Sequence, residues 1–220
     1  ASAAREQLRK ETEEALLAFG IPAAADEAGW ARLARDGSAL RGQPADAVQK
    51  GARLLEKEWR RDEQSRDRET AEKAHGKLAR LDVLAALRRL RQRLDDASRP
   101  PFAWPARGAG TKLPGWWDAA ADAALVAGVL TYGFGRWAAM LGDTALFPAE
   151  TGASKASDLA AMAEGAGKKA ILRRLKELKE AAPPPAGGAK PPPPKPKAPV
   201  DPRAAAEAKA KEQKAKASAT

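Results

Sequence analysis

The sequence contains no cysteine and a single histidine, His75. The absence of cysteine excludes disulfides, thiolate metal sites and thiol catalysis. With no second histidine, a metal site or a serine–histidine–aspartate arrangement has little to build on, and we expect His75 to be a solvated surface imidazole. We therefore expect no catalytic residue, no metal and no cofactor, and interpret the chain as a non-enzymatic module.

Strand-forming residues and long apolar runs are also scarce. There are one Tyr and four Phe in 220 residues, while Ala, Leu, Arg, Lys and Glu dominate, which predicts an all-α protein. No apolar run approaches the ~20 residues that a membrane span needs, which leaves binding in solution or at an anionic membrane surface. Of these we expect binding in solution, with no membrane partner.

Positive charge is in excess. The formal net charge is +10 and the isoelectric point is about 9.9. Such an excess favours polyanionic partners, above all nucleic acid. The chain begins at Ala1 without a methionine or a signal-peptide core, so we expect a fragment of a longer protein whose catalysis lies elsewhere.

The first part of the chain has the pattern of three short helices. Apolar residues recur every three or four positions from Ala4 to Phe19, again after a cap at Asp26, and again after Pro44. Trp30 and Trp59 occupy apolar positions of this pattern, so we expect them in a core. The sequence predicts one compact domain over residues 4–62.

A connector, a long helix and a proline-rich linker are predicted over residues 63–112. Six leucines form a seam along the helix, namely Leu78, Leu81, Leu84, Leu87, Leu90 and Leu94. Four arginines crowd its other side, namely Arg88, Arg89, Arg91 and Arg93. The segment "SRPPFAWPARGAG" then ends the helix because proline lacks an amide donor. We interpret this helix as a spacer between two domains.

A second pattern of three helices covers residues 113–182. Trp117 and Trp137 fall at core positions. Trp104 and Trp116 lie in irregular segments near prolines, where either could stack on a partner or clamp the linker against this domain, and we expect the clamp. Residues 148–167 are predicted to be an inserted loop with one helical turn around residues 159–162. The expected fold is thus two three-helix bundles joined by a long spacer helix.

The end of the chain, residues 183–220, is rich in proline and then in lysine and alanine. It cannot bury enough apolar area to offset its ordering entropy, so we expect a disordered C-terminal tail.

The last predicted helix, "KKAILRRLKELKEA", is the most basic one. At 100° per residue its apolar residues share one arc, which contains Ile171, Leu172, Leu175 and Leu178. Its cations are the predicted DNA contacts, namely Lys168, Lys169, Arg173, Arg174, Lys176 and Lys179, with help from Arg88, Arg89, Arg91 and Arg93. Lys and Arg without Asn or Gln nearby bind phosphates and read few base edges, so weak sequence preference is expected.

Two motifs suggest chemistry that the spacing does not support. The stretch "GAGTK" lacks the phosphate-loop spacing and no strand precedes it. Asp118 and Asp122 share a helix face, but a helix cap followed by an acidic first turn accounts for both without catalysis.

The segment "LPGWWDAAADAALVAGVLTYGFGRWAAMLGDTALF" resembles the SLIDE domain of chromodomain-helicase-DNA-binding remodellers. The positions that match the family pattern are Trp116, Trp117, Asp122, Leu125, Gly128, Val129, Tyr132, Gly133, Trp137, Asp143 and Leu146. Upstream, "TEEALLAFGIP" and "WARLARDGSALRGQPADAVQKGARLLEKEWRR" resemble the SANT domain that precedes SLIDE, so that the resemblance spans about residues 5–182.

This resemblance implies a SANT-SLIDE unit of a nuclear chromatin remodeller. Such a unit binds nucleosome-flanking duplex DNA with little sequence preference and couples it to an ATP-driven motor that this chain lacks. We expect it to be a monomer. The alternative is a protein-interaction module for histone tails or corepressors, for which Glu11, Glu13 and Glu14 would supply an acidic groove.

Overall fold

A computed structural model of the protein describes residues 2–24, 26–36, 40–108, 110, 112–148 and 153–185. The expected disordered tail lies outside the described residues from position 186 onward. Residues Ala1–Pro183 belong to one compact unit. The division of this unit into domains at residues 62 and 112 stays a prediction.

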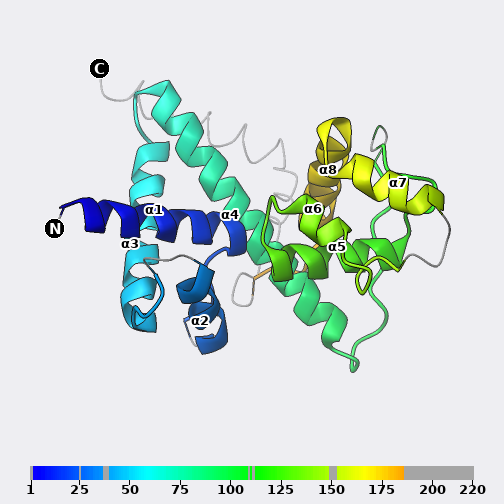
Figure 1. Cartoon of the computed structure of the whole chain (residues 1–220), viewed down its shortest axis with the longest axis horizontal. Coiled ribbons are helices and arrows are strands. Elements are labelled where there is room, and N and C mark those ends of the chain that lie inside the picture. Colours follow the sequence, from blue (N-terminus) through cyan, green and yellow to red (C-terminus); the bar gives the residue numbers. More distant parts are fainter. Residues whose placement is uncertain are drawn as a thin grey trace, which may run out of the picture. The chain divides into compact units, whose positions relative to one another are not determined.

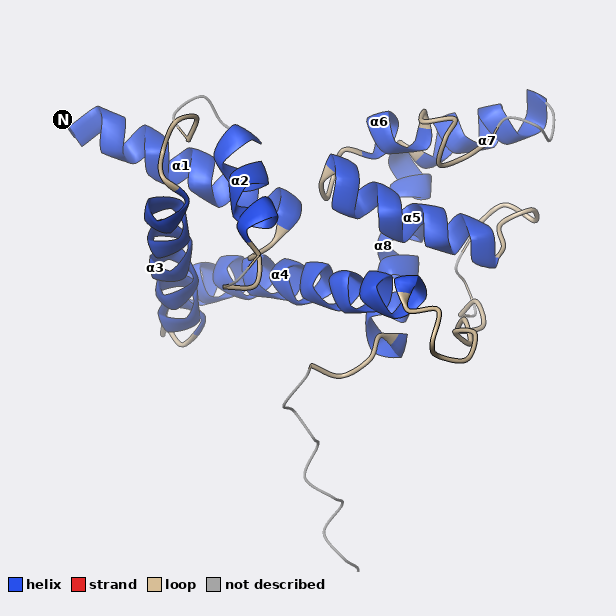
Figure 2. Cartoon of the chain, turned by 90° about the horizontal axis from the view of Figure 1, so that it is seen from below, coloured by secondary structure: helices blue, strands red, loops and turns tan. Residues whose placement is uncertain are grey.

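The described residues form helices and no strands, which confirms the all-α class (Figures 1 and 2). In chain order the helices are α1 (Ser2–Phe19), α2 (Glu27–Asp36), α3 (Ala45–Glu63), α4 (Arg68–Asp95), α5 (Ala119–Tyr132), α6 (Trp137–Leu141), α7 (Ala153–Met162) and α8 (Gly165–Ala181). No helix in these ranges combines the length and apolar character needed to cross a membrane.

The residues predicted to end or begin the first three helices lie at their boundaries in the structure. Gly20 ends α1 with a φ of 76°, a conformation that favours glycine. The Asp26 carboxylate caps α2 by accepting a hydrogen bond from the Gly29 amide at 2.8 Å. Pro44 directly precedes α3.

The buried side chains form two clusters, and α4 belongs to both. Its first half adds Ala74, Leu78 and Leu81 to the cluster made by α1–α3. Its second half adds Leu84, Leu87 and Leu90 to the cluster made by α5–α8. The leucine seam is therefore confirmed, but α4 is more than a spacer because both cores are built on it (Figure 2).

The tryptophans lie where their positions in the pattern predicted. Trp30, Trp59, Trp117 and Trp137 are buried. Trp104 and Trp116 are half-buried and pack against the second cluster, as expected of residues that clamp the linker.

The last turn of α1 contacts the corner between α5 and α6. Gly133, with a φ of 96°, makes this corner, and the next amide, of Phe134, donates to the Ala18 carbonyl at 2.7 Å. Arg32 of α2 donates to the Leu130 carbonyl of α5 at 2.9 Å. The two clusters are thus connected by direct contacts as well as by α4.

The expected loop over residues 148–167 is wrong in most of its length. Residues 153–162 form α7, and the buried side chains of Leu159 and Met162 join the second cluster. Alanine-rich sequence forms a helix readily but offers little apolar periodicity, so the pattern concealed a helix of ten residues.

Candidate nucleic-acid interface

Helix α8 is held in the protein by one face. Ala170, Ile171, Leu175 and Leu178 are buried, and the helix packs against α4 and α7 (Figure 1). An amphipathic helix fixed in this way leaves its opposite face to solvent.

Arg174 does not lie on that exposed face, so its prediction as a DNA contact is wrong. Only 2% of the residue is exposed, and its guanidinium binds the Asp122 carboxylate of α5 with N–O distances of 2.5 and 2.9 Å. It also donates to Glu177 at 2.6 Å and to the Pro105 carbonyl at 2.8 Å. The hydrogen bond that Arg174 donates to the Asp122 carboxylate raises the pKa of Arg174, so this buried guanidinium stays charged within the core.

Asp118 and Asp122 differ in role. Asp118 caps α5 by accepting from the Ala121 amide at 2.9 Å, as expected. Asp122 is more than part of an acidic first turn, because it is buried and accepts from the Trp117 indole at 2.8 Å as well as from Arg174. It is a structural anchor for α8.

The exposed face of α8 brings together four of the predicted cations, namely Lys168, Lys169, Arg173 and Lys176. Leu172, which the pattern placed on the apolar arc, is 42% exposed and lies among them, four residues from Lys168 and from Lys176. Lys179 is at the edge of this face, with its Nζ 3.8 Å from the Asp82 carboxylate of α4.

The linker before α5 runs along α8 and adds two cations that sequence reasoning missed. The Gly108 amide donates to the Glu177 carboxylate at 3.2 Å, and Arg173 donates to the Gly110 carbonyl at 2.7 Å. Arg107 and Lys112 of this segment are exposed. No sequence signal could have found them, since the contacts join residues more than sixty positions apart.

The four α4 arginines do not form the expected patch. Arg88 is half-buried and donates to the carbonyls of Phe19 and Ile21, and burial lowers its pKa. Arg89 donates to the Pro183 carbonyl at 2.8 Å, at the end of α8. These two guanidinium groups stabilise the chain around them.

The other two arginines of α4 also bind within the protein. Arg91 pairs with Asp95 at 2.9 Å, and Arg93 donates to the Pro100 carbonyl. All four thus have contacts within the protein, and DNA binding through Arg91, whose side chain is 46% exposed, stays a prediction.

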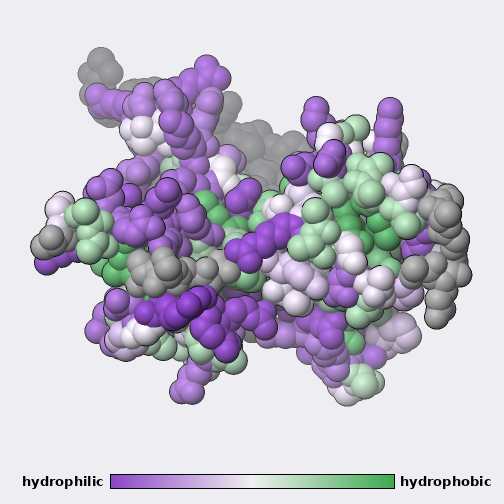
Figure 3. Space-filling view, in the orientation of Figure 1, coloured by the Kyte–Doolittle hydropathy of each residue, from purple (hydrophilic) through white to green (hydrophobic). Residues whose placement is uncertain are grey.

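Helices α5–α7 contribute little charge to a DNA surface. Their only cations are Arg136, in the corner before α6, and Lys155, whose Nζ lies 5.0 Å from the centre of the Trp116 ring. Figure 3 shows apolar residues gathered around α5–α7, whereas hydrophilic residues cover most of the face around α1–α3. The cations of this half therefore come from α8 and the linker.

The glutamates of α1 do not form the acidic groove that the alternative function needs. Glu11 is buried and accepts from Gln7 at 2.8 Å. Glu13 pairs with Lys77 of α4 at 2.6 Å, which leaves Glu14 as the exposed member of the three.

The described residues offer no metal site beside this surface. His75 is exposed and bonded to the Glu63 carboxylate at 2.8 Å. In the described ranges no group of three or more histidine, cysteine, aspartate or glutamate side chains could hold a metal ion. Comparisons with protein-family models, curated proteins and solved structures found no match to this chain.

Proposed function

We propose that this chain binds duplex DNA through the exposed face of α8 and the adjacent linker. The observation that carries the proposal is the grouping of Lys168, Lys169, Arg173 and Lys176 on one side of a helix whose other side is anchored in a core. Arg107 and Lys112 extend this group, which we name the α8 cationic surface.

The chemistry of this surface favours phosphates over bases. Lys and Arg bind phosphate oxygens of any sequence, whereas reading adenine edges relies on Asn or Gln. The chain has no asparagine, and neither the linker nor α8 contains glutamine. We therefore propose binding with little sequence preference.

The finer architecture is part of the proposal. Three helices before α4 and the helices after it would correspond to SANT-like and SLIDE-like units, with α4 as the helix between them. The residues that resemble the family support this assignment: Trp117 and Trp137 lie in the core that carries α8. The chain would then act in the nucleus, as a monomeric DNA-binding part of an ATP-dependent remodeller on nucleosomes.

A mobility-shift titration with duplex DNA tests the proposal. Reversing Lys169, Arg173 and Lys176 to Glu should weaken binding at least a hundredfold, because three phosphate contacts become repulsive. The matched control reverses Lys50, Arg53 and Lys57, which are exposed cations of α3 at similar spacing. Equal losses in both triple variants would show a general charge effect and overturn the proposed surface.

A second control reverses Lys209, Lys211 and Lys214 in the tail. If this variant lost more affinity than the α8 variant, DNA would be bound by the tail and the proposal would fail. A separate binding assay with a histone-tail peptide and no DNA tests the alternative function at matched salt, and binding of the peptide but not of DNA would favour that alternative.

A further inference from the structure

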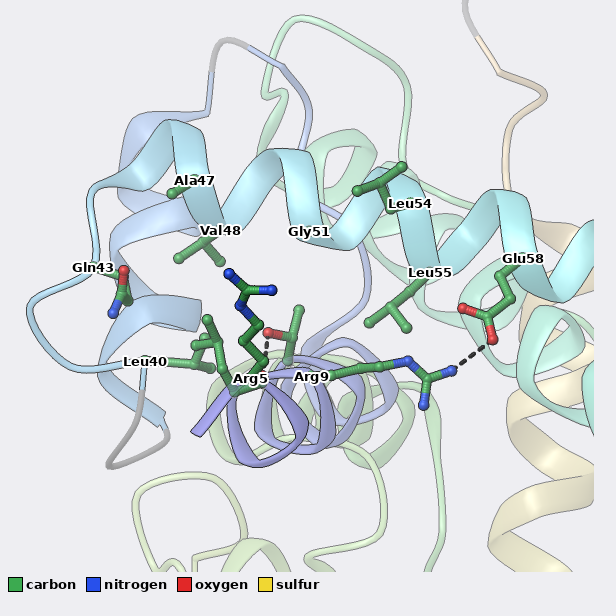
Figure 4. Close-up of a pocket in the computed structure, with 12 residues that line it drawn as sticks. Arg5, Arg9, Leu40, Gln43, Ala47, Val48, Gly51, Leu54, Leu55 and Glu58 are labelled. Carbon is green, nitrogen blue, oxygen red and sulfur yellow. Dashed lines mark hydrogen bonds and ion pairs between the residues drawn. The ribbon is translucent and has the colours of Figure 1, made fainter. Parts of the chain in front are cut away.

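A groove with a cavity volume of about 360 Å³ lies between α1 and α3 (Figure 4). None of the residues that line it belongs to α8. Leu8 and Thr12 of α1 face Val48, Gly51 and Leu55 of α3 across it, and Leu40 closes one end. Its lining is mainly apolar, as in grooves that bind helical segments.

Gly51 and Leu54 make this groove unusual. A Cβ at Gly51 would have Thr12 Cγ2 as its nearest neighbour, at 3.9 Å, so the glycine leaves space in the middle of the wall. Leu54 is 68% exposed, the highest exposure of any large apolar side chain among the described residues. An apolar groove with an exposed leucine at its edge indicates an interaction site.

Cations outnumber anions around the groove. Arg5 reaches over it from α1, and Arg9 pairs with Glu58 across it at 2.6 Å (Figure 4). Lys50 and Lys57 lie one turn before and one turn after Leu54 on the solvent side of α3. The Lys50 Nζ pairs with the exposed Asp46 carboxylate at 3.5 Å. Within the described residues, neither Arg5 nor Lys57 has an ion-pair partner in this structure.

We propose that the groove binds an amphipathic helix of a partner protein, with one apolar face and acidic flanks. Its α3 wall runs from Ala47 to Glu58, roughly 16 Å at 1.5 Å per residue, which matches three helical turns. Apolar anchors at i, i+3 or i+4 and i+7 would fill the space at Gly51 and cover Leu54. The carboxylates of the partner would then face Arg5, Lys50 and Lys57.

The positive charge around the groove favours an acidic helix over a basic peptide as its ligand. A basic segment, such as a histone tail or the lysine-rich end of this chain, would face like charge. The proposal concerns a different surface from the α8 cationic surface and does not rest on DNA binding.

Two substitutions close the groove without removing a buried contact. Gly51→Met places a side chain in the empty space and replaces a helical glycine, which favours the helix. Leu54→Asp changes an exposed residue and adds a like charge for the acidic partner. The matched control is Leu172→Asp, which changes the exposed leucine of α8.

The test is a selection of displayed helical peptides of about 14 residues against the full chain, followed by fluorescence anisotropy with the enriched peptides. We expect the enriched peptides to have apolar anchors at helical spacing and a net negative charge. Their affinity should be at least tenfold lower for Gly51→Met and Leu54→Asp than for the unsubstituted chain, and unchanged for Leu172→Asp. The Lys50, Arg53 and Lys57 reversal should also weaken them tenfold while sparing DNA.

Three results would overturn the proposal. One is the absence of enrichment, another is a set of basic peptides, and the third is peptides that bind all variants equally. The groove could also bind a second copy of this chain, which sedimentation of the free chain tests. A dimer that Leu54→Asp dissociates would assign the groove to that second copy and overturn the proposal. Circular dichroism of each variant confirms that its helices remain formed.

Discussion

Arg174 and Asp122 form a buried ion pair that connects three segments of the chain. The arginine lies on α8, the aspartate on α5, and the same guanidinium donates to the Pro105 carbonyl of the linker. A buried pair of this kind holds its partners in place because each charge depends on the other for compensation.

Removing one charge of this pair should destabilise the protein strongly. Arg174→Met leaves the Asp122 carboxylate buried without its partner, which typically costs about 3–5 kcal/mol. Arg173→Met, at the exposed neighbouring position, should cost less than about 1 kcal/mol in the same urea titration. Similar midpoints for the two variants would show that the pair does not anchor α8.

Trp59 and Trp117 are both buried, but their indole nitrogens differ. The Trp117 Nε1 donates to Asp122 at 2.8 Å, whereas the Trp59 Nε1 is buried without a hydrogen-bond partner. Trp117→Phe should therefore lose about 1–3 kcal/mol more stability than Trp59→Phe, because only the former removes a hydrogen bond to a buried carboxylate. Chemical denaturation of both variants measures the difference, and an equal loss would contradict the assigned bond.

Leu172 and Arg174 show where sequence reasoning about α8 failed. Arg174 follows Ile171 by three positions and precedes Leu178 by four, so it lies on the buried side of the helix. Leu172 is rotated by about 100° from Ile171, toward the cations. The pattern alone placed the leucine on the apolar arc. It could not show that Arg174 is buried, because the carboxylate that compensates this arginine, on Asp122, lies 52 positions away in the sequence.

At the scale of elements, the turn after α1 is pressed against α4. A Cβ added to Gly20 would lie 2.9 Å from Leu84 Cβ, while one added to Gly42 would have nothing within 4 Å. Both glycines have a positive φ, of 76° and 86°. Alanine substitutions at Gly20 and Gly42 therefore share the backbone strain, but only the substitution at Gly20 adds a steric contact.

Gly20→Ala should lower the melting temperature more than Gly42→Ala. Both variants incur a backbone cost of about 1–2 kcal/mol, but only the first also displaces α4. Differential scanning calorimetry measures both. Equal decreases in melting temperature would mean that α4 moves away from the new methyl group at no loss of stability, contrary to the packing at Leu84 described above.

Helical periodicity predicted α1–α6 and α8 because each has an apolar face that a core covers. It predicted only the last turn of α7, whose alanines give helix propensity with little apolar periodicity, and it could not reveal that α4 serves two cores. The exposed lysines of α8 followed from the pattern as well. The contribution of Arg107 and Lys112 did not, since only the folded chain brings the linker to α8.

For the whole molecule, the salt dependence of DNA binding counts the phosphates that the α8 cationic surface neutralises. Six exposed cations engaged together would give a slope of log K against log salt near −5, at roughly −0.9 per phosphate. The Lys169, Arg173 and Lys176 reversal should make this slope shallower by about three, equally for DNA of any sequence. An unchanged slope would place the contacts outside α8.

Because one continuous helix is built into both cores, α4 also fixes their rotational phase. Inserting a single residue between Leu81 and Leu84 would turn every later position by about 100° and carry Leu87 and Leu90 away from the second core. The length of α4 at this point is therefore constrained as tightly as its composition. A change in residue count there would uncouple the groove on α1 and α3 from the cations of α8, even if every side chain were kept.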